Sequence, residues 1–279
     1  MEFHSPTTID EACRLLAVPD ARALAGGQSL VAMMNLGLVS PQRLVSLRRI
    51  EGLAAIQTLP DGGVRIGAMT THAELAVFAP HAAGPRLVML AARVVAYPAV
   101  RNLGTIGGAV ALADPSADYP CALVAAGASI EITSADGTRL VTAADFFRGV
   151  FETTLGAGEL VSAIHVPPGP AGAGAHYEKF SLVAGDYAIA AVAAIVAADS
   201  MRCRAAQIAI GACGPHPVRS HAAEQTLCAG RLDDAAIAAA GATIAGACSP
   251  SDDSRASAAY RRRIVPALVR RALAAVSVQ

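Results

Sequence analysis

Short apolar runs alternate with amphipathic segments along the first 170 residues of the chain. Thr8 with Glu11, and Thr71 with Glu74, have the spacing of capping boxes and predict helices that start just after each threonine. Apolar runs bounded by turn residues predict strands and two hairpins, at 21–25, 43–47, 53–59 with 64–68, 128–133 with 138–142, and 159–166. This alternation predicts an α+β fold.

A Pro- and Gly-rich stretch, 167–174, is the clearest change of composition and predicts a domain boundary. Apolar runs at 176–182, 188–198 and 203–212 then predict a small antiparallel sheet, although the Ala-rich middle run would also suit a helix. From about residue 220 the pattern is helical and predicts helices packed on that sheet. We divide the chain into an N-terminal subdomain, a second subdomain and a C-terminal domain of three strands plus helices: 1–55, 56–170 and 175–279.

Two paired-glycine loops lie where apolar runs end, about eighty positions apart. Each contains a hydroxyl residue, and the two sequences are Ala25-Gly26-Gly27-Gln28-Ser29-Leu30 and Thr105-Ile106-Gly107-Gly108. Glycine allows successive amides to turn inward into a concave nest that binds anionic oxygens. The pair therefore suggests one phosphorylated ligand held between the loops, although a single Gly-Gly is equally a turn signal.

Other residues allow two interpretations. Asp118 follows the second loop, where it would face a neutral hydroxyl or ring edge of the ligand, serve as the N-cap of a helix over 119–126, or do both. His72 could be a catalytic base, but its place in a first helical turn favours a surface residue. We assign Met33 and Met34 to the core.

Composition excludes several classes of function. The chain has 22 Lys and Arg against 22 Asp and Glu, and Arg261–Arg263 is its only basic run, so a nucleic-acid-binding surface is not expected. Six dispersed cysteines without a Cys-x-x-Cys pair favour reduced buried thiols over disulfides, zinc ligands or iron–sulfur ligands. Apolar runs fall short of a membrane span, and the first residues lack a secretory signal, so we expect a cytoplasmic protein.

Five segments in order carry a family resemblance: 25–30, 101–108, 113–118, 177–180 with 184–188, and 260–262. On these the chain resembles the FAD-binding medium subunit of the molybdenum hydroxylases, the family of carbon monoxide, xanthine and aldehyde dehydrogenases. The resemblance implies a two-part FAD-binding region of the vanillyl-alcohol-oxidase (PCMH) type. A small antiparallel sheet with a helical cluster would follow it.

The resemblance also implies roles for individual residues. The pyrophosphate of FAD would lie on Ala25, Gly26, Gly27, Gln28, Ser29 and Leu30 of the first loop and on Thr105, Ile106, Gly107 and Gly108 of the second. Asp118 would bind a sugar or ribityl hydroxyl, and Leu160 would lie at the adenine end. Lys179 would reach the flavin and stabilise its reduced anion, unless it is a surface lysine paired with Glu178 or Asp186. Ala109 stands where the family often has Ser or Asn, which leaves only its amide.

By the same resemblance, the partners would be a small subunit with [2Fe–2S] clusters and a large molybdopterin subunit, in a dimer of heterotrimers. This chain would pass electrons from those clusters through FAD to an external acceptor. The alternatives are a stand-alone flavin oxidase or dehydrogenase and a non-catalytic assembly scaffold. We discount a nicotinamide site, because neither loop has the G-x-G-x-x-G spacing or opens a βαβ unit with an acidic residue about twenty positions on.

Overall fold

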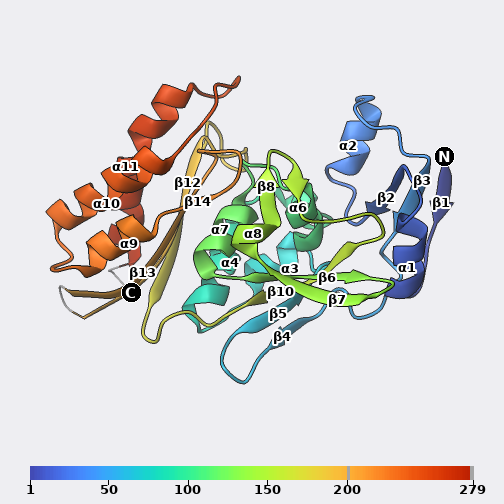
Figure 1. The fold of residues 1–279 in the computed structure, drawn as a ribbon, viewed down its shortest axis with the longest axis horizontal. Coiled ribbons are helices and arrows are strands. Elements are labelled where there is room, and N and C mark those ends of the chain that lie inside the picture. The colour runs from blue at the N-terminus through green and yellow to red at the C-terminus, as the bar shows by residue number, and fades with distance from the viewer. Residues whose placement is uncertain (200–201, 277–279) are drawn as a thin grey trace.

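The computed structural model describes residues 1–199 and 202–276 as three units that follow one another along the long axis of the molecule (Figure 1). The first has a parallel sheet of order β1-β3-β2. Its elements are β1 (Glu2–His4), α1 (Ile9–Leu16), β2 (Ala21–Leu24), α2 (Leu30–Asn35) and β3 (Arg43–Ser46). The Thr8 side chain caps α1 by accepting the Glu11 amide, as predicted.

Two expectations need correction or qualification in this unit. Strands β2 and β3 are parallel and joined through the first glycine loop and α2, so this loop opens a βαβ connection, but β3 neither contains nor ends at an acidic residue. However, α2 has no buried residue and is not packed as a crossover helix. Met33 and Met34 are only half-buried and do not belong to the core, because the six residues of α2 project from the sheet (Figure 1).

The second unit contains a five-stranded antiparallel sheet of order β4-β5-β10-β6-β7, including both predicted hairpins. Its strands are β4 (Ile56–Thr58), β5 (Val64–Gly67), β6 (Ser129–Ser134), β7 (Gly137–Thr142) and β10 (Leu160–Val166), with a separate pair, β8 (Phe147–Gly149) and β9 (Glu152–Thr153). Its helices are α3 (His72–Val77), α4 (Ala83–Val94), α5 (Pro98–Arg101), α6 (Ile106–Leu112), α7 (Asp118–Ala126) and α8 (Ala143–Phe146). Thr71 and Glu74 form the predicted capping box of α3.

The third unit is an antiparallel sheet of order β11-β12-β13-β14 with three helices. Its elements are β11 (Gly174–Phe180), β12 (Ala190–Asp199), β13 (Arg202–Gly211), β14 (Val218–Arg219), α9 (His221–Cys228), α10 (Asp234–Ala247) and α11 (Ala258–Val276). The sequence pattern predicted three strands, and the two-residue β14 adds a fourth.

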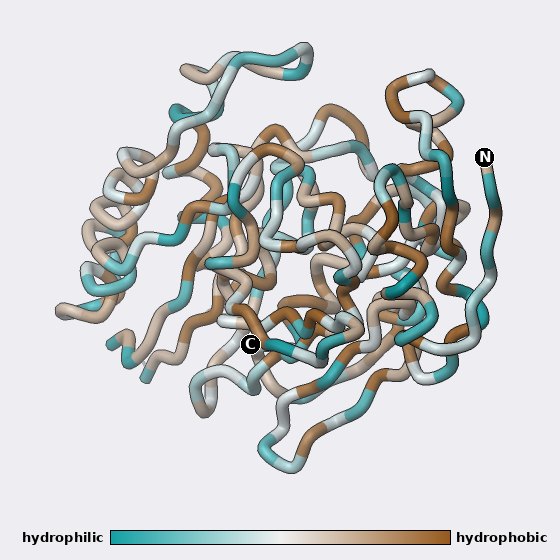
Figure 2. The backbone as a smooth tube through the Cα atoms, turned by 45° about the vertical axis from the view of Figure 1, so that its right-hand side comes forward, coloured by the Kyte–Doolittle hydropathy of each residue, from teal (hydrophilic) through white to brown (hydrophobic). Residues whose placement is uncertain are grey.

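Both faces of the third sheet are buried, which explains the continuous apolar run of β12. Ala191, Ala193 and Ile195 join the core shared with α4 and α7, whereas Val192 and Ala194 join the core formed with α10 and α11. Hydrophobic segments accordingly run through the interior of the molecule (Figure 2). None of the helices in the described part of the chain is long and apolar enough to cross a membrane.

Candidate functional site

The structure brings the two glycine loops into direct contact. A β-carbon at Gly26 would overlap the carbonyl oxygen of Leu103, and it would lie 2.8 Å from the α-carbon of Gly104. A β-carbon at Gly108 would lie 3.6 Å from that of Ala25. The loops therefore form one continuous surface, as the sequence hypothesis required, and glycine is needed at position 26 because the other loop is so close.

The first loop offers free hydrogen-bond donors. The backbone amides of residues 26–30 have no partner among the described residues, and Gly27 has a φ of 72°. Ser29 is the N-cap residue of α2, but its hydroxyl makes no capping bond. Gln28 is exposed, and its side-chain amide donates to the Gly26 carbonyl at 3.3 Å. A run of open amides beside a free hydroxyl fits an anionic ligand such as a pyrophosphate.

The second loop, in contrast, uses its amides internally. The amide of Ile106 donates to Thr70, that of Gly107 donates to Ala68 at 2.8 Å, and that of Gly108 donates to the Thr105 hydroxyl at 3.2 Å. The Ala109 amide donates to the Thr105 carbonyl at 3.1 Å. We expected the amides of the second loop and of Ala109 to be available to a ligand, and this expectation is wrong because all four donate within the protein.

A buried His–Tyr pair lies beneath the second loop. His72 is only 5% exposed, which contradicts the expected surface position, and its Nδ1 lies 3.0 Å from the Tyr119 hydroxyl. Burial lowers the pKa of His72 from 6.5 to about 4, so the ring is neutral near pH 7. A β-carbon at Gly104 would lie 2.7 Å from His72 Nε2, and the His72 amide donates to the Gly104 carbonyl. These contacts of His72 could not be found from the sequence, because Gly104 and Tyr119 lie 32 and 47 positions away from it.

Asp118 and Lys179 form an ion pair in the interior. Lys179 Nζ lies 2.9 Å from Asp118 Oδ2 and 3.1 Å from the Val94 carbonyl, while the Tyr177 hydroxyl donates to Asp118 Oδ1. Burial raises the pKa of Asp118, and the ammonium of Lys179 opposes this shift. Ala117, not Asp118, is the N-cap residue of α7, so the capping interpretation is wrong. Lys179 is also not a surface lysine.

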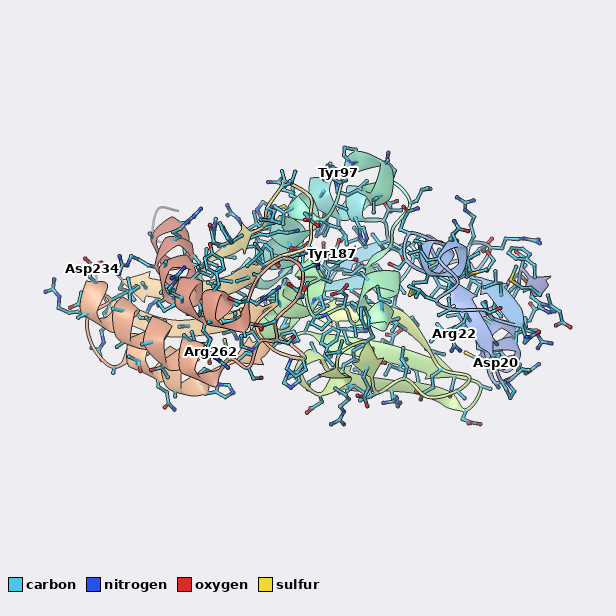
Figure 3. The ribbon with its side chains drawn as sticks, turned by 90° about the horizontal axis from the view of Figure 1, so that it is seen from above. Asp20, Arg22, Tyr97, Tyr187, Asp234 and Arg262 are labelled. Carbon is cyan, nitrogen blue, oxygen red and sulfur yellow. The ribbon has the colours of Figure 1, made fainter. Side chains whose placement is uncertain are left out.

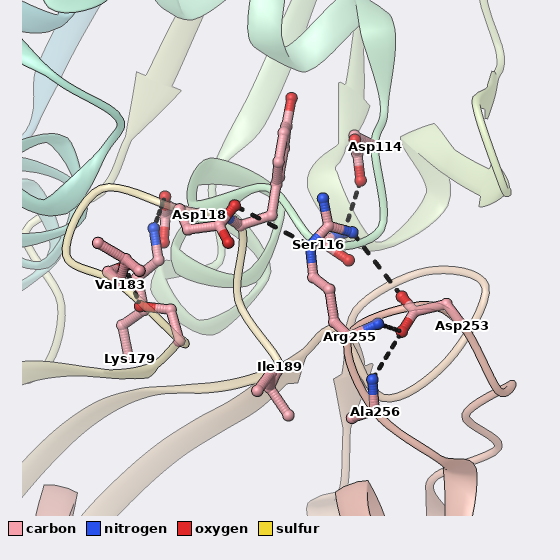
Figure 4. A network of polar contacts seen from close by, with 12 residues as sticks. Asp114, Ser116, Asp118, Lys179, Val183, Ile189, Asp253, Arg255 and Ala256 are labelled. Atoms are coloured by element: carbon pink, nitrogen blue, oxygen red, sulfur yellow. Dashed lines mark hydrogen bonds and ion pairs between the residues drawn. The ribbon is translucent and has the colours of Figure 1, made fainter.

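A second polar network joins the motif at 184–188 to the one at 260–262. The Arg255 guanidinium lies 5.2 Å from the Tyr187 ring centre, within cation–π range, and Asp253 accepts from the amide of Arg255 (Figure 4). Arg261 is 3% exposed and donates to the Ile189 carbonyl and to Asp253. The sequence showed this arginine as part of a basic run and of the 260–262 motif, but the carbonyls that it binds carry no sequence signal.

A surface cleft of about 420 Å³ lies between residues 16–23 and 155–159. Asp20 and Arg22 line it at the N-terminal end of the molecule, far from Tyr187 in Figure 3. Leu160 follows the lining segment directly, but it is 3% exposed and packs in the N-terminal core with Leu16 and Val45. Leu160 thus lies behind the wall of the cleft.

Known proteins resemble this chain over its whole described length. A family model described as the FAD binding domain in molybdopterin dehydrogenase matches residues 1–169, and the CO dehydrogenase flavoprotein C-terminal domain matches residues 175–276. The carbon monoxide dehydrogenase medium chain of Afipia carboxidovorans is 36% identical, with 98% of this chain and 95% of that protein covered. The nicotine 6-hydroxylase medium subunit of Paenarthrobacter nicotinovorans is 34% identical, with 98% and 96% covered. The structure of carbon monoxide dehydrogenase from Hydrogenophaga pseudoflava has a TM-score of 0.94 at 35% identity, with 100% and 97% covered.

Proposed function

Because this chain belongs to the family of FAD-binding medium subunits of molybdenum hydroxylases, we propose that it is the electron-transfer subunit of such a complex. It would accept electrons from [2Fe–2S] clusters on a partner and pass them to an external acceptor. The open amides of the first glycine loop, held against the second loop, are the observation that carries this proposal.

The residues of the two loops fit the pyrophosphate of FAD. The amides of residues 26–30 and the Ser29 hydroxyl would donate to its oxygens, while Thr105 to Ala109 would form the closely packed floor beneath. Ala25 would contribute through its contact with Gly108. The cleft in front of Leu160 would receive the adenine end.

Asp118 and Lys179 retain capacity for a ligand. Each carboxylate oxygen of Asp118 accepts one bond here and has a further lone pair for a sugar or ribityl hydroxyl. Lys179 uses two of its three donors, on Asp118 and Val94, and the third could reach the flavin. Bound FAD would supply a carrier that takes up one or two electrons, and the chain would only bind it, orient it and tune its charge.

The proposed partners are a small iron–sulfur subunit and a large molybdopterin subunit, in a dimer of heterotrimers in the cytoplasm. The proposal retains the division of the chain into 1–55, 56–170 and 175–279. In support, separate hydrophobic cores form around α1 and around α10 with α11.

Expression of the full chain alone tests the proposal. The purified chain should take up FAD and turn yellow, yet it should not reduce a dye with carbon monoxide, an aldehyde or a purine. Co-expression with the iron–sulfur and molybdopterin subunits should then permit dye reduction with the substrate of the complex, and this activity should be lost when FAD is removed.

Each other outcome favours one of the alternatives. Oxidation of an organic substrate by the chain and FAD alone would indicate a stand-alone flavin enzyme. A chain that folds but takes up no FAD, even when it is co-expressed with its partners, would indicate an assembly scaffold.

A further inference from the structure

Two pairs of neighbouring thiols occur in the third unit, apart from the proposed FAD site. Cys203 lies near the start of β13 and Cys228 is the last residue of α9, and their sulfur atoms are 3.2 Å apart. Cys213 and Cys248 are also neighbours, since the Cys248 thiol raises the pKa of Cys213. All six cysteines are free thiols.

The two pairs differ in access to solvent. Cys213 and Cys248 are 0% and 4% exposed, so a dissolved oxidant cannot reach either sulfur in the folded protein. Cys203 is 2% exposed, but Cys228 is only half-buried at the C-terminal end of its helix. The Cys203–Cys228 pair therefore combines close contact with one accessible sulfur, and the other pair lacks that access.

The backbone elements around Cys203 and Cys228 are already held in place. Glu224 of α9 is 7% exposed and accepts the amide of Ile208 in β13 at 2.9 Å, which fixes the helix on the sheet (Figure 1). A disulfide has a sulfur–sulfur distance of about 2 Å, so the two sulfurs need to approach by only about 1 Å. Because α9 is held on the sheet, we expect rotation of the two cysteine side chains to supply this movement.

We propose that Cys203 and Cys228 form a reversible disulfide, which links α9 covalently to β13 under oxidising conditions. Low-molecular-weight disulfides such as oxidised glutathione are the oxidant. This modification site is independent of the proposed electron-transfer function, because neither residue belongs to the glycine loops or the Asp118–Lys179 pair.

The exchange begins at Cys228. Its thiol loses a proton to solvent, and the thiolate attacks one sulfur of oxidised glutathione, which forms a mixed disulfide and releases one glutathione thiolate. Cys203 then loses its proton and attacks the Cys228 sulfur, which releases the second glutathione. Two protein thiols are oxidised and one glutathione disulfide is reduced to two thiols. Burial raises the pKa of Cys203 to about 12, so Cys203 acts second, within the pair.

Peptide mapping of the full chain after treatment with oxidised glutathione tests this proposal. Trypsin should release residues 220–231 linked to the dipeptide Cys203–Arg204, and dithiothreitol should separate them. The thermal midpoint should rise by about 5 °C on oxidation, since the link closes a loop in the unfolded chain.

Variants separate the two steps of the exchange. Cys203→Ser should accumulate the mixed disulfide at Cys228, and Cys228→Ser should remain unmodified, with no rise in midpoint for either. Cys13→Ala is the control, because Cys13 is a buried thiol of the first unit and its loss should leave the linked peptide unchanged. A wild-type chain that stops at the mixed disulfide, stays unmodified or links other cysteines would overturn the proposal.

Discussion

The two glycine loops have similar sequences but opposite hydrogen-bonding environments. In the first, the amides of residues 26–30 are open and the following helix buries none of its residues. In the second, the amides of residues 106–109 all have partners inside the protein, and Thr105, Ile106 and Gly107 are buried. The first loop has open amides, and the second is a closely packed segment that lies against it.

The same dipeptide therefore meets two different physical needs. In the second loop, Gly107 permits contact with Ala68 at 2.8 Å between amide and carbonyl, where any β-carbon would clash. In the first, Gly26 permits contact with Leu103, while Gly27 supplies a backbone conformation that other residues rarely adopt. A Gly-Gly pair thus marks close packing in one case and an open nest in the other.

The largest expected effect concerns the buried ion pair of Asp118 and Lys179, which follows the second loop along the chain. Lys179→Met should lower the free energy of unfolding by about 4 kcal/mol, because it leaves the Asp118 carboxylate buried without its cation. The double variant Asp118→Asn with Lys179→Met should recover part of this loss in urea denaturation. A single variant as stable as wild type, with unchanged FAD content and reoxidation rate, would remove both proposed roles of Lys179.

Separating the loops should have the next largest effect. Gly26→Val places side-chain atoms where Leu103 lies, so the first loop must move and FAD affinity should fall about hundredfold, or roughly 3 kcal/mol. Fluorescence titration of the FAD-free chain measures this change. Gly246→Ala is the control, since a β-carbon there meets no other atom within 4 Å. Equal affinities for both variants would contradict the role of the loop contact.

Acid should lower the stability of the fold through His72, which is buried beneath the second loop. The native His72 has a pKa of about 4 against 6.5 for the ordinary group, so the unfolded chain binds the extra proton between these values. The contribution of His72 to the free energy of unfolding is complete above pH 6.5. It falls by about 1.5 kcal/mol between pH 6.5 and pH 5. His72→Gln should remove this part of the pH dependence in denaturation curves. A parallel dependence in both proteins would show that His72 does not titrate this way.

The smallest effects should distinguish the two hydroxyls. Ser29→Ala should weaken FAD binding by about fivefold, or about 1 kcal/mol, without a change in stability, because the hydroxyl makes no capping bond. Thr105→Ala should instead lower stability by about 1 kcal/mol, because Thr105 caps α6 through Gly108. FAD titration and thermal unfolding of both variants test this contrast. The same change in affinity and in stability for both variants would contradict it.

Most of the fold followed from local sequence signals. The N-cap at Thr8, the capping box at Thr71, turn residues in both hairpins and the continuous apolar strand β12 were confirmed, and so was the α+β architecture of the matched family. The short strands β1 and β14 were missed because their three and two residues are too few to show a period. The assignment of Met33 and Met34 to the core was wrong, because periodicity predicts a helix but does not show which elements pack on it.

The contacts of the candidate site residues could not be predicted from the sequence. Motifs indicated Gly26, Asp118 and Lys179, but the ion pair between the last two joins positions 61 apart, and no pattern of spacing reveals it. The hydrogen bond of His72 likewise joins it to a tyrosine 47 positions away. Long-range pairing decides whether a polar residue is buried, so local patterns could not give the state of these side chains.

The alanines of β12 have a consequence for protein engineering. Two family models meet near residue 170, which suggests interchangeable modules. Yet the sheet of the second module completes the hydrophobic core of the first, through Ala191 and Ala193 against α4 and α7. A truncation at this boundary would leave those helices exposed to water, and chimeras between relatives would need matched residues on both sides of the junction.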